Sequence, residues 1–372
     1  MKIDVRVEDK IIFVQCILSV PYFRDGYSFA LAESMIIDGM ECCGKNVEYD
    51  SLECQMEFKP PMKKITVKDT VGEIVIRYHG GLMGTFAFLE RSLIHFSSYN
   101  GWYPCGFDVD QDIEVMFHAN DTWEMVHAEY IGEKGMWKYV PSKEGFFDCN
   151  ILLLKRDAYH FFENDKVRFC CMKDCSLQLQ SCMDTYSKVY QFYIELYGID
   201  KIGKNTIVYL LEQENCYGGY KRSGLIVFLG IPKDLGNHKH YLAHEMGHSY
   251  GCGADCSTWE DWLNETVAEW SALLYEEKYD RNNFEKNIRE HQNCMNGEVL
   301  NLKECGENRP ENVHHVGTLI VYEIYKRYGR EAVEVLLKIF DKLTSKTTKG
   351  LLEMISDMGR PELADLLKGF ME

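Results

Sequence analysis

The chain has 372 residues, of which 46% are apolar, a length and composition typical of two globular domains and not of a disordered chain. Its 41 Lys and Arg residues against 58 Asp and Glu residues give a formal net charge of −17. A field of that sign repels phosphate backbones and anionic lipid headgroups, so we expect neither nucleic-acid nor membrane partners. No run of residues approaches the ~20 consecutive apolar residues that a membrane span needs.

Fifteen cysteines would suit the disulfide framework of a small secreted domain. Their number is odd, however, the chain is large, and the N-terminal residues show no apolar signal-peptide core. We therefore expect mostly reduced thiols and a cytoplasmic protein.

Residues 1–165 predict mainly β-strands. Residues 65–67 and 74–76 are β-branched runs, and Ile113, Val115 and Phe117 alternate with Asp112, Glu114 and Met116. Turn-forming pairs separate such runs: Gly80-Gly81, Asn100-Gly101 and Asn120-Asp121. Only residues 22–40 interrupt this pattern, with a segment that admits a helix.

The pattern changes near Arg168. Apolar residues at helical spacing predict a helix over 177–197, and strands follow over 206–211 and 224–229. Beyond Leu235 we expect helices over 239–250, 259–278, 313–328 and 331–343, and two short helices before Glu372. The fold class is therefore α+β, with a β-rich domain over 1–165 and an α-rich domain over 166–372. The boundary falls between Asp157 and Asp174.

Residues 244–248 read His-Glu-Met-Gly-His and carry the most chemical information. On a helix, residues four apart share a face, so His244 and His248 can hold one ion while Glu245 flanks it. Zinc takes nitrogen and carboxylate ligands, and a catalytic site keeps one position open for water. Gly247 costs about 1 kcal/mol against alanine inside a helix, and the close approach of another backbone would explain it.

The next predicted helix carries Glu265 and Glu269 in an otherwise apolar segment. Unpaired carboxylates are expensive to bury, and a metal beneath them would supply the missing charge. The alternative for either residue is a solvated helix face. The histidine pair upstream favours ligation.

The His-Glu-x-x-His motif and the Trp-Leu-Asn-Glu sequence at residues 262–265 resemble the gluzincin zinc metallopeptidases, and most closely the aminopeptidase N family (peptidase MA-like). Residues 102–104 are similar to a Trp-Tyr-Pro segment of that family's N-terminal β domain. Residues 218–226 stand where the family has a Gly-x-Met-Glu-Asn-x-Gly-Leu edge strand, and residues 314–317 where it has Tyr-x-x-Gly. The resemblance implies an N-terminal β-sheet domain, a thermolysin-like, mostly helical catalytic domain with a small sheet, and one Zn²⁺ per chain.

The resemblance also implies roles for individual residues. It selects Glu265 as the third zinc ligand beside His244 and His248. It makes Glu269 the carboxylate that orients a ligand histidine through its free ring N–H. Glu245 would then be the general base that takes the proton of a zinc-bound water.

The family's oxyanion-binding tyrosine corresponds to His314 here. An imidazole N–H can also donate to an oxyanion, so we assign this role to His314, with His315 as the rival. The alternative is that both histidines are surface residues. Tyr322 and Tyr325 are weaker candidates, because they fit better as core-facing aromatic residues.

The segment Gly218, Gly219, Tyr220, Lys221 and Arg222 corresponds to the family's substrate-binding strand, but Lys221 replaces the glutamate that binds a free amino terminus. Two like charges about 4 Å apart repel by about 4 kcal/mol at an effective dielectric near 20, so we do not expect a strict aminopeptidase. Lys221 and Arg222 would instead hold a substrate carboxylate or phosphate, or face solvent on an edge strand. Because successive strand residues point to opposite faces, at most one of the two faces the site.

Two groups of cysteines are candidates for further sites. Cys170, Cys171, Cys175 and Cys182 lack the paired Cys-x2-Cys spacing of a structural zinc site, so we favour reduced core thiols over a second metal. Cys252 and Cys256 follow the metal motif closely and form either a redox-sensitive pair or part of an ordinary loop.

The sequence therefore predicts a cytoplasmic zinc metallopeptidase that acts on peptides without a strict need for a free amino terminus. Two alternatives stay open. The same site would suit a zinc hydrolase that attacks a non-peptide bond in a small molecule, and the fold would suit a non-catalytic peptide-binding protein. The sequence does not indicate an oligomeric state.

Overall fold

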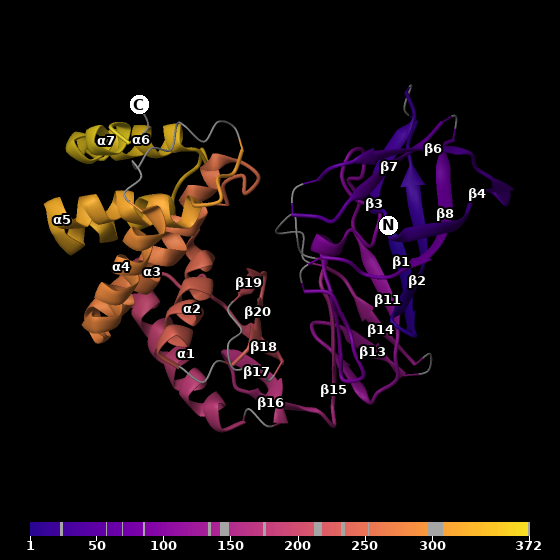
Figure 1. Ribbon diagram of the computed structural model, residues 1–372, viewed down its shortest axis with the longest axis horizontal. Helices are drawn as coiled ribbons and strands as arrows, with labels where there is room; N and C mark the ends of the chain where they lie inside the picture. Colours follow the sequence, from indigo (N-terminus) through magenta and orange to yellow (C-terminus); the bar gives the residue numbers. More distant parts are fainter. Residues whose placement is uncertain are drawn as a thin grey trace. The chain divides into compact units, whose positions relative to one another are not determined.

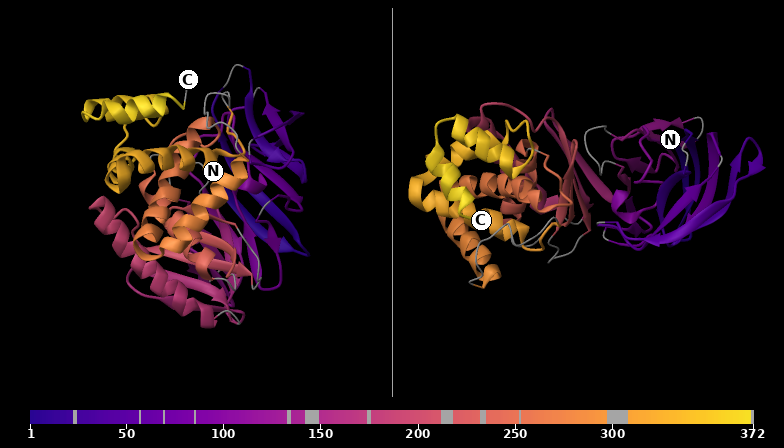
Figure 2. Two further views of the ribbon diagram at one scale, coloured as in Figure 1. Left: turned by 60° about the vertical axis from the view of Figure 1, so that its left-hand side comes forward. Right: turned by 90° about the horizontal axis from the view of Figure 1, so that it is seen from above.

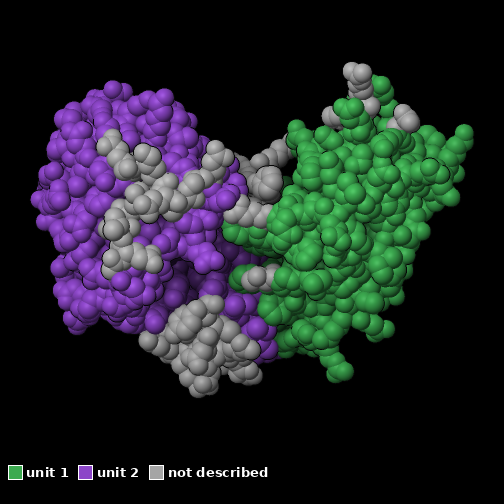
Figure 3. All heavy atoms as spheres, turned by 45° about the horizontal axis from the view of Figure 1, so that its top comes forward, with its two compact units in different colours: residues 1–161 green, residues 162–372 purple. Residues whose placement is uncertain are grey.

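The computed structural model describes residues 1–22, 25–56, 58–68, 70–84, 86–132, 135–141, 149–173, 176–211, 218–231, 235–251, 253–296 and 308–370. The chain forms two compact units, Met1–Phe161 and Phe162–Glu372 (Figure 3). None of the helices in these ranges combines the length and apolar character that a bilayer crossing requires.

The first unit is built from β-strands. Its eight-stranded sheet has the order β13-β14-β11-β1-β2-β8-β4-β5 (Figure 1). The strands are β1 (Lys2–Glu8), β2 (Ile11–Val20), β4 (Met35–Cys42), β5 (Lys45–Asn46), β8 (Gly72–Gly80), β11 (Glu114–His118), β13 (Glu129–Ile131) and β14 (Met136–Tyr139). Within it β1 pairs with β2 in antiparallel and with β11 in parallel orientation.

Two smaller sheets complete this unit. The three-stranded sheet β3-β7-β6 contains β3 (Tyr27–Ala32), β6 (Tyr49–Cys54) and β7 (Met62–Val67). The four-stranded sheet β12-β15-β10-β9 contains β9 (Phe88–Leu89), β10 (Leu93–Phe96), β12 (Trp123–Met125) and β15 (Ile151–Lys155). The short 3-10 turn η1 (Ser98–Asn100) leads to Trp102, which is fully buried and packs edge-on against Phe96.

The helix-like interpretation of residues 22–40 is wrong, because this segment contains strands β3 and β4. Every residue of β3 is buried, from Tyr27 to Ala32. A strand buried on both faces loses the alternation of apolar and polar residues, so its sequence cannot be distinguished from a buried helix by periodicity. The half-exposed strand β2, by contrast, alternates as expected, with Ile12, Val14 and Leu18 buried.

The second unit has one five-stranded sheet, of order β16-β17-β18-β20-β19. Its strands are β16 (Tyr159–Glu163), β17 (Val167–Met172), β18 (Asn205–Leu211), β19 (Gly219–Arg222) and β20 (Leu225–Gly230). Strands β17, β18 and β20 are parallel, and β19 is an antiparallel edge strand on β20. The helices of the unit gather on one side of this sheet (Figures 1 and 2).

Helices make up most of the second unit. They are α1 (Ser176–Tyr197), α2 (Leu235–Gly247), α3 (Trp262–Tyr279), α4 (Arg281–Met295), α5 (Val313–Phe340), α6 (Thr348–Asp357) and α7 (Pro361–Lys368). The 3-10 turn η4 (His248–Tyr250) continues α2, and η5 (Trp259–Asp261) precedes α3. The helices predicted over 177–197, 239–250 and 259–278 are confirmed. The two helices predicted over 313–343 form α5, which is broken at Gly329 by a backbone of φ 76° and ψ −175°.

Helix α4 was not predicted. Its buried residues are Phe284, Asn287, Ile288 and Met295, so its apolar stripe is narrow and includes a polar side chain. A helix with so few apolar residues gives little periodic signal in the sequence.

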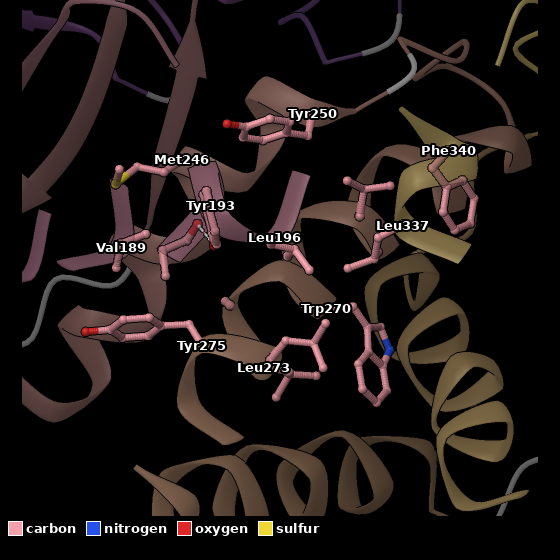
Figure 4. Close-up of a cluster of buried hydrophobic side chains, with 14 of the residues drawn as sticks. Val189, Tyr193, Leu196, Met246, Tyr250, Trp270, Leu273, Tyr275, Leu337 and Phe340 are labelled. Carbon is pink, nitrogen blue, oxygen red and sulfur yellow. Dashed lines mark hydrogen bonds between the residues drawn. The ribbon is translucent and has the colours of Figure 1, made fainter. Parts of the chain in front are cut away.

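One hydrophobic core lies beneath the helices of the second unit (Figure 4). It joins side chains of α1, α2, α3 and α5: Val189, Tyr193, Leu196, Met246, Trp270, Leu273, Leu337 and Phe340. The hydroxyl of Tyr193 donates to the carbonyl of Ala243 at 2.7 Å, which ties α1 to the turn of α2 that carries the metal motif. This packing fixes α2 and α3 as a rigid base for the site.

Candidate metal centre

The three residues predicted to bind metal come together in the second unit. His244 lies in the last turn of α2, His248 begins η4, and Glu265 lies in the first turn of α3. One ligand atom from each residue lies within 4.8 Å of the other two. The Oε2 atom of Glu265 is 3.5 Å from Nε2 of His244 and 3.8 Å from Nε2 of His248. Atoms about 2 Å from one tetrahedral ion lie roughly 3.3 Å apart, so the spacing suits zinc.

Gly247 explains why α2 and α3 meet at this point. A Cβ atom added to Gly247 would lie 2.9 Å from both Cα and the carbonyl oxygen of Ala268 on α3. Glycine is therefore the residue that lets the two backbones touch between the histidine pair and Glu265. The expected close approach of another backbone at Gly247 is confirmed.

The carboxylate groups of the site fit a bound cation. Within the described residues, Oε2 of Glu245 is buried and forms no hydrogen bond. The Oε2 atom of Glu265 is also buried, and ring nitrogens of His314 and His244 lie 3.1 and 3.5 Å from it. A buried carboxylate oxygen without a donor carries a large desolvation cost. A divalent ion held by His244, His248 and Glu265 would offset that cost. These three side chains are of the kinds that bind zinc, so they fit a zinc site.

The electrostatics of the site act in opposite directions on its two candidate ligand histidines. Burial would lower the pKa of His244, but the carboxylates of Glu265 and Glu269 outweigh it and raise that pKa to about 10, so a metal ion that binds His244 would displace a proton from its ring. Burial lowers the pKa of His248 to about 3, so its ring is neutral and can offer a lone pair. Burial would raise the pKa of Glu265, but the imidazoles of His248, His314 and His244 outweigh it and hold that pKa well below its usual range. Burial raises the pKa of Glu245 to about 7, which is the range in which a carboxylate can both accept and return a proton near neutral pH.

Glu269 lies one turn beyond Glu265 and contacts His244 from the other side. Its Oε2 atom is 2.8 Å from Nδ1 of His244. An ionised carboxylate only accepts, so Nδ1 carries a proton and Nε2 is the nitrogen of His244 that a metal ion could bind in place of a proton. That nitrogen is the one that faces Glu265.

Two histidines that the sequence analysis missed also contact Glu269. His240 approaches its Oε1 atom at 3.0 Å and His291 approaches the same atom at 2.8 Å. His240 precedes His244 by one helical turn, so the i, i+4 spacing on α2 was a signal that could have found it. His291 lies on α4, the helix that was not predicted, and nothing in the sequence marked it.

His314 and His315 take different positions on α5. The Nδ1 atom of His314 is 3.1 Å from Oε2 of Glu265, beside the metal ligands. His315 instead contacts His291, with their Nδ1 atoms 2.9 Å apart. Gly317 allows α5 this close to α3, because a Cβ there would lie 2.2 Å from the hydroxyl of Thr266.

Arg309 is a further residue that the sequence analysis did not single out. Its Nε atom donates to Oδ2 of the buried Asp261 at 2.6 Å. Its Nη2 atom lies 3.4 Å from Nε2 of His314 and 3.9 Å from Oε1 of Glu265. Arg309 therefore links Asp261, His314 and Glu265, although it is 44 residues from Glu265 in the sequence.

The substrate-binding segment predicted over 218–222 forms the edge strand β19 and the residue before it. Gly218 has φ +122°, a backbone conformation that favours glycine. A Cβ on Gly219 would lie 2.8 Å from the Phe228 ring and the Val227 carbonyl, so a larger residue would clash there. Lys221 and Arg222 are half-buried. Burial dominates the raised pKa of Glu245, and the positive charges of Arg222 and Lys221 oppose it.

The cysteine groups contribute no metal site in the part of the chain that the structure describes, where His244, His248 and Glu265 are the one group of three metal-binding side chains within reach of each other. Cys170, Cys171 and Cys182 are buried thiols, and Cys256 is a half-buried one. Cys175 and Cys252 lie outside the described residues.

Comparison with known proteins identifies the fold. No family model and no curated protein matches the sequence. An aminopeptidase N family protein from Idiomarina loihiensis matches with a TM-score of 0.72 at 11% identity, over 100% of this chain and 75% of that one. An M1 zinc metallopeptidase from Deinococcus radiodurans matches with a TM-score of 0.63 at 13% identity, over 100% of this chain and 93% of that one.

Yeast LTA4 hydrolase matches with a TM-score of 0.65 at 12% identity, over 98% of this chain. The present chain spans 66% of the length of that structure. At these identities the likeness shows the fold alone. The chain has the α+β fold of the M1 zinc metallopeptidases, with an N-terminal multi-sheet unit followed by a mostly helical unit, as the sequence predicted.

Replacing Gly247 by alanine tests the contact between α2 and α3. We expect Gly247→Ala to destabilise the protein by about 1–3 kcal/mol, because the new methyl group meets backbone that cannot move aside. This loss should exceed the gain of about 1 kcal/mol from helix propensity. The measurement is urea unfolding. Gly81→Ala is the control, since a Cβ there meets open space. A Gly247→Ala protein as stable as the parent would contradict the close approach.

Proposed function

We propose that the chain is a zinc-dependent metallopeptidase that hydrolyses peptide bonds with Glu245 as general base. The observation that carries this proposal is the convergence of His244, His248 and Glu265 beside the buried, unpartnered oxygen of Glu245. Two imidazoles and one carboxylate leave the fourth position of a tetrahedral zinc ion open for water, as in catalytic sites. The M1 zinc metallopeptidase fold supports the same interpretation.

The ligand residues would supply a neutral lone pair from each histidine and a negative charge from Glu265. Zinc held by these residues would lower the pKa of a bound water to about 7 and would polarise the scissile carbonyl. Glu245 takes the proton of the attacking water and returns it to the leaving amine. The raised pKa of about 7 that burial gives Glu245 supports both halves of this transfer.

His314 is the better candidate for the oxyanion donor. A guanidinium can only donate, so the Arg309 contact makes Nε2 of His314 the acceptor and leaves the proton of the neutral ring on Nδ1. Burial lowers the pKa of His314, which supports the neutral form. Nδ1–H faces the metal ligands, where an oxyanion would form. His315 contacts His291 and has no such position.

The charges near Glu245 argue against strict aminopeptidase specificity. Lys221 stands where the related family binds a substrate ammonium, and its charge and that of Arg222 reach Glu245. An N-terminal ammonium beside them would be repelled. We therefore propose peptides without a required free amino terminus as substrates, with a carboxylate near the scissile bond as the group that Lys221 or Arg222 would bind.

A zinc hydrolase that acts on a non-peptide bond is the second candidate. One of the proteins with the same fold is named a leukotriene A4 hydrolase, and another is named a zinc metallopeptidase. Proteins of this fold are therefore named for different classes of substrate. Activated water attacks other electrophiles as well as amides. The ligand set and Glu245 would be the same in both cases.

Replacing Glu245 by glutamine tests the general base. Glu245→Gln should lower turnover of a diverse peptide mixture by about 10²- to 10⁴-fold, because the amide cannot accept the water proton. Parent and variant should each hold one zinc per chain by elemental analysis. Glu285→Gln, which changes an exposed carboxylate of α4, should leave turnover unchanged. Zinc-loaded parent protein that cleaves no peptide would overturn the peptidase proposal and favour the second candidate.

Replacing His314 by phenylalanine tests the oxyanion donor. His314→Phe should lower kcat by about 10²-fold, as the loss of one oxyanion hydrogen bond does in other hydrolases. Its zinc content should stay equal to that of the parent, because His314 is not among the three ligands. The companion variant is His315→Phe. Loss of kcat in His315→Phe, with none in His314→Phe, would move the role to His315.

A further inference from the structure

The carboxylate of Glu269 is shared by three imidazoles from two other helices. His244 of α2 contacts Oε2 at 2.8 Å, while His240 of α2 and His291 of α4 contact Oε1 at 3.0 and 2.8 Å. The Glu269 side chain is only 6% exposed. Because a carboxylate accepts and never donates when ionised, each of the three nitrogens must carry a proton. The two oxygens therefore have separate partners, Oε2 on the metal-ligand side and Oε1 on the far side.

A second carboxylate, that of Glu276, contacts the other ring nitrogen of His240. That nitrogen, Nδ1, is 3.2 Å from Oε1 of Glu276, and the side-chain amide of Asn287 donates to Oε2 of the same carboxylate at 2.8 Å. Glu276 is buried. Burial alone would lower the pKa of His240, but Glu269 and Glu276 outweigh it and hold that pKa well above its usual value. A cationic imidazole between two buried carboxylates satisfies both of them.

His291 is held in the same manner from α5. Its Nε2 atom donates to Glu269, and its Nδ1 atom meets Nδ1 of His315 at 2.9 Å. These contacts make a continuous set of hydrogen bonds from α5 through α4 and α3 to α2. The set ends at Nδ1 of His244, the ring nitrogen opposite the one that would bind metal.

We propose that His240 and His291 are positioning residues for the zinc ligand His244. By holding Oε1 of Glu269 they fix the carboxylate so that Oε2 keeps the His244 ring in place, with Nε2 free to bind zinc. Zinc affinity then depends on two histidines that do not touch the metal. This inference rests on the proposed zinc site and adds to it the residues that set its strength.

The test is the zinc affinity of the purified, metal-stripped full chain, measured by competition with a chelating indicator. His240→Asn and His291→Asn should each bind zinc about 10- to 100-fold more weakly than the parent, because partners behind a ligand histidine contribute by that amount. Asparagine is too short to place a donor at the Nε2 position. Glutamine reaches it, so His240→Gln should restore most of the affinity.

The matched control is His238→Asn. His238 is a buried histidine on the same helix whose Nε2 atom lies 2.8 Å from the hydroxyl of Tyr209, and it makes no described contact with Glu269. This variant should bind zinc like the parent. Equal zinc affinity in the parent, His240→Asn and His291→Asn would overturn the inference, as would an equal loss in His238→Asn.

A double-mutant cycle separates positioning from general loss of structure. If His240 acts through Glu269, His240→Asn should weaken zinc binding much less in a Glu269→Gln background than in the parent. Equal losses in both backgrounds would overturn the inference. If His240→Asn does not fold, His291→Asn carries the same cycle. A parent chain that binds no zinc would contradict the proposed function itself. Normal peptide cleavage together with unaltered zinc affinity in the variants would contradict the positioning role alone.

Discussion

The second unit is organised by the cost of burying carboxylates. Glu245, Glu269 and Glu276 are all buried in the helical layer, and Glu265 lies among them with little exposure. A buried carboxylate must be neutralised, paired or bound to a metal. Glu276 and Glu269 meet this requirement with imidazoles. Glu265 is surrounded by ring nitrogens of His244, His248 and His314 at 3.1 to 3.8 Å. A metal ion bound by Glu265 and the first two of these histidines would supply the compensating charge.

The metal motif could be predicted from sequence because its geometry is local. One helical turn places His244 and His248 together whatever surrounds them, and the clash that a side chain at Gly247 would create with α3 is visible in sequence as an unfavourable residue in a helix. The choice of a third candidate ligand required more than local geometry, since Glu265 and Glu269 lie only one helical turn apart. The resemblance to a family chose between them, and the structure places Glu265 at the ligand distances and Glu269 behind His244.

Other parts of the site were beyond reach of sequence patterns. His291 depends on α4, whose few buried residues give a weak signal. Arg309 reaches Asp261 across 48 residues, and no local rule connects them. In the first unit, the fully buried strand β3 lost the alternation that identifies a strand. The missed features are therefore those fixed by tertiary packing, which local propensity does not contain.

The identities of 11–13% to proteins of the same fold show how little of a sequence the fold requires. Cores tolerate extensive apolar substitution when volume and pattern are kept, so the fold by itself does not establish an activity. The residues of the site carry that information, and the proposals on specificity and oxyanion binding rest on Lys221 and His314. The charge of Lys221 opposes the effect of burial on the pKa of Glu245, and His314 lies beside Glu265.

The hydrogen-bonded histidines around Glu269 are difficult to explain by stability alone. Buried ionic groups can often be replaced by apolar residues of similar volume without loss of stability, and sometimes with a gain. A network of three imidazoles on one carboxylate, backed by a second buried carboxylate, is therefore an expensive way to join α2, α3 and α4. What apolar packing cannot provide is a fixed ring orientation and a fixed tautomer for His244. A metal centre would need both, so the network is best explained by the proposed role of His244 as a metal ligand.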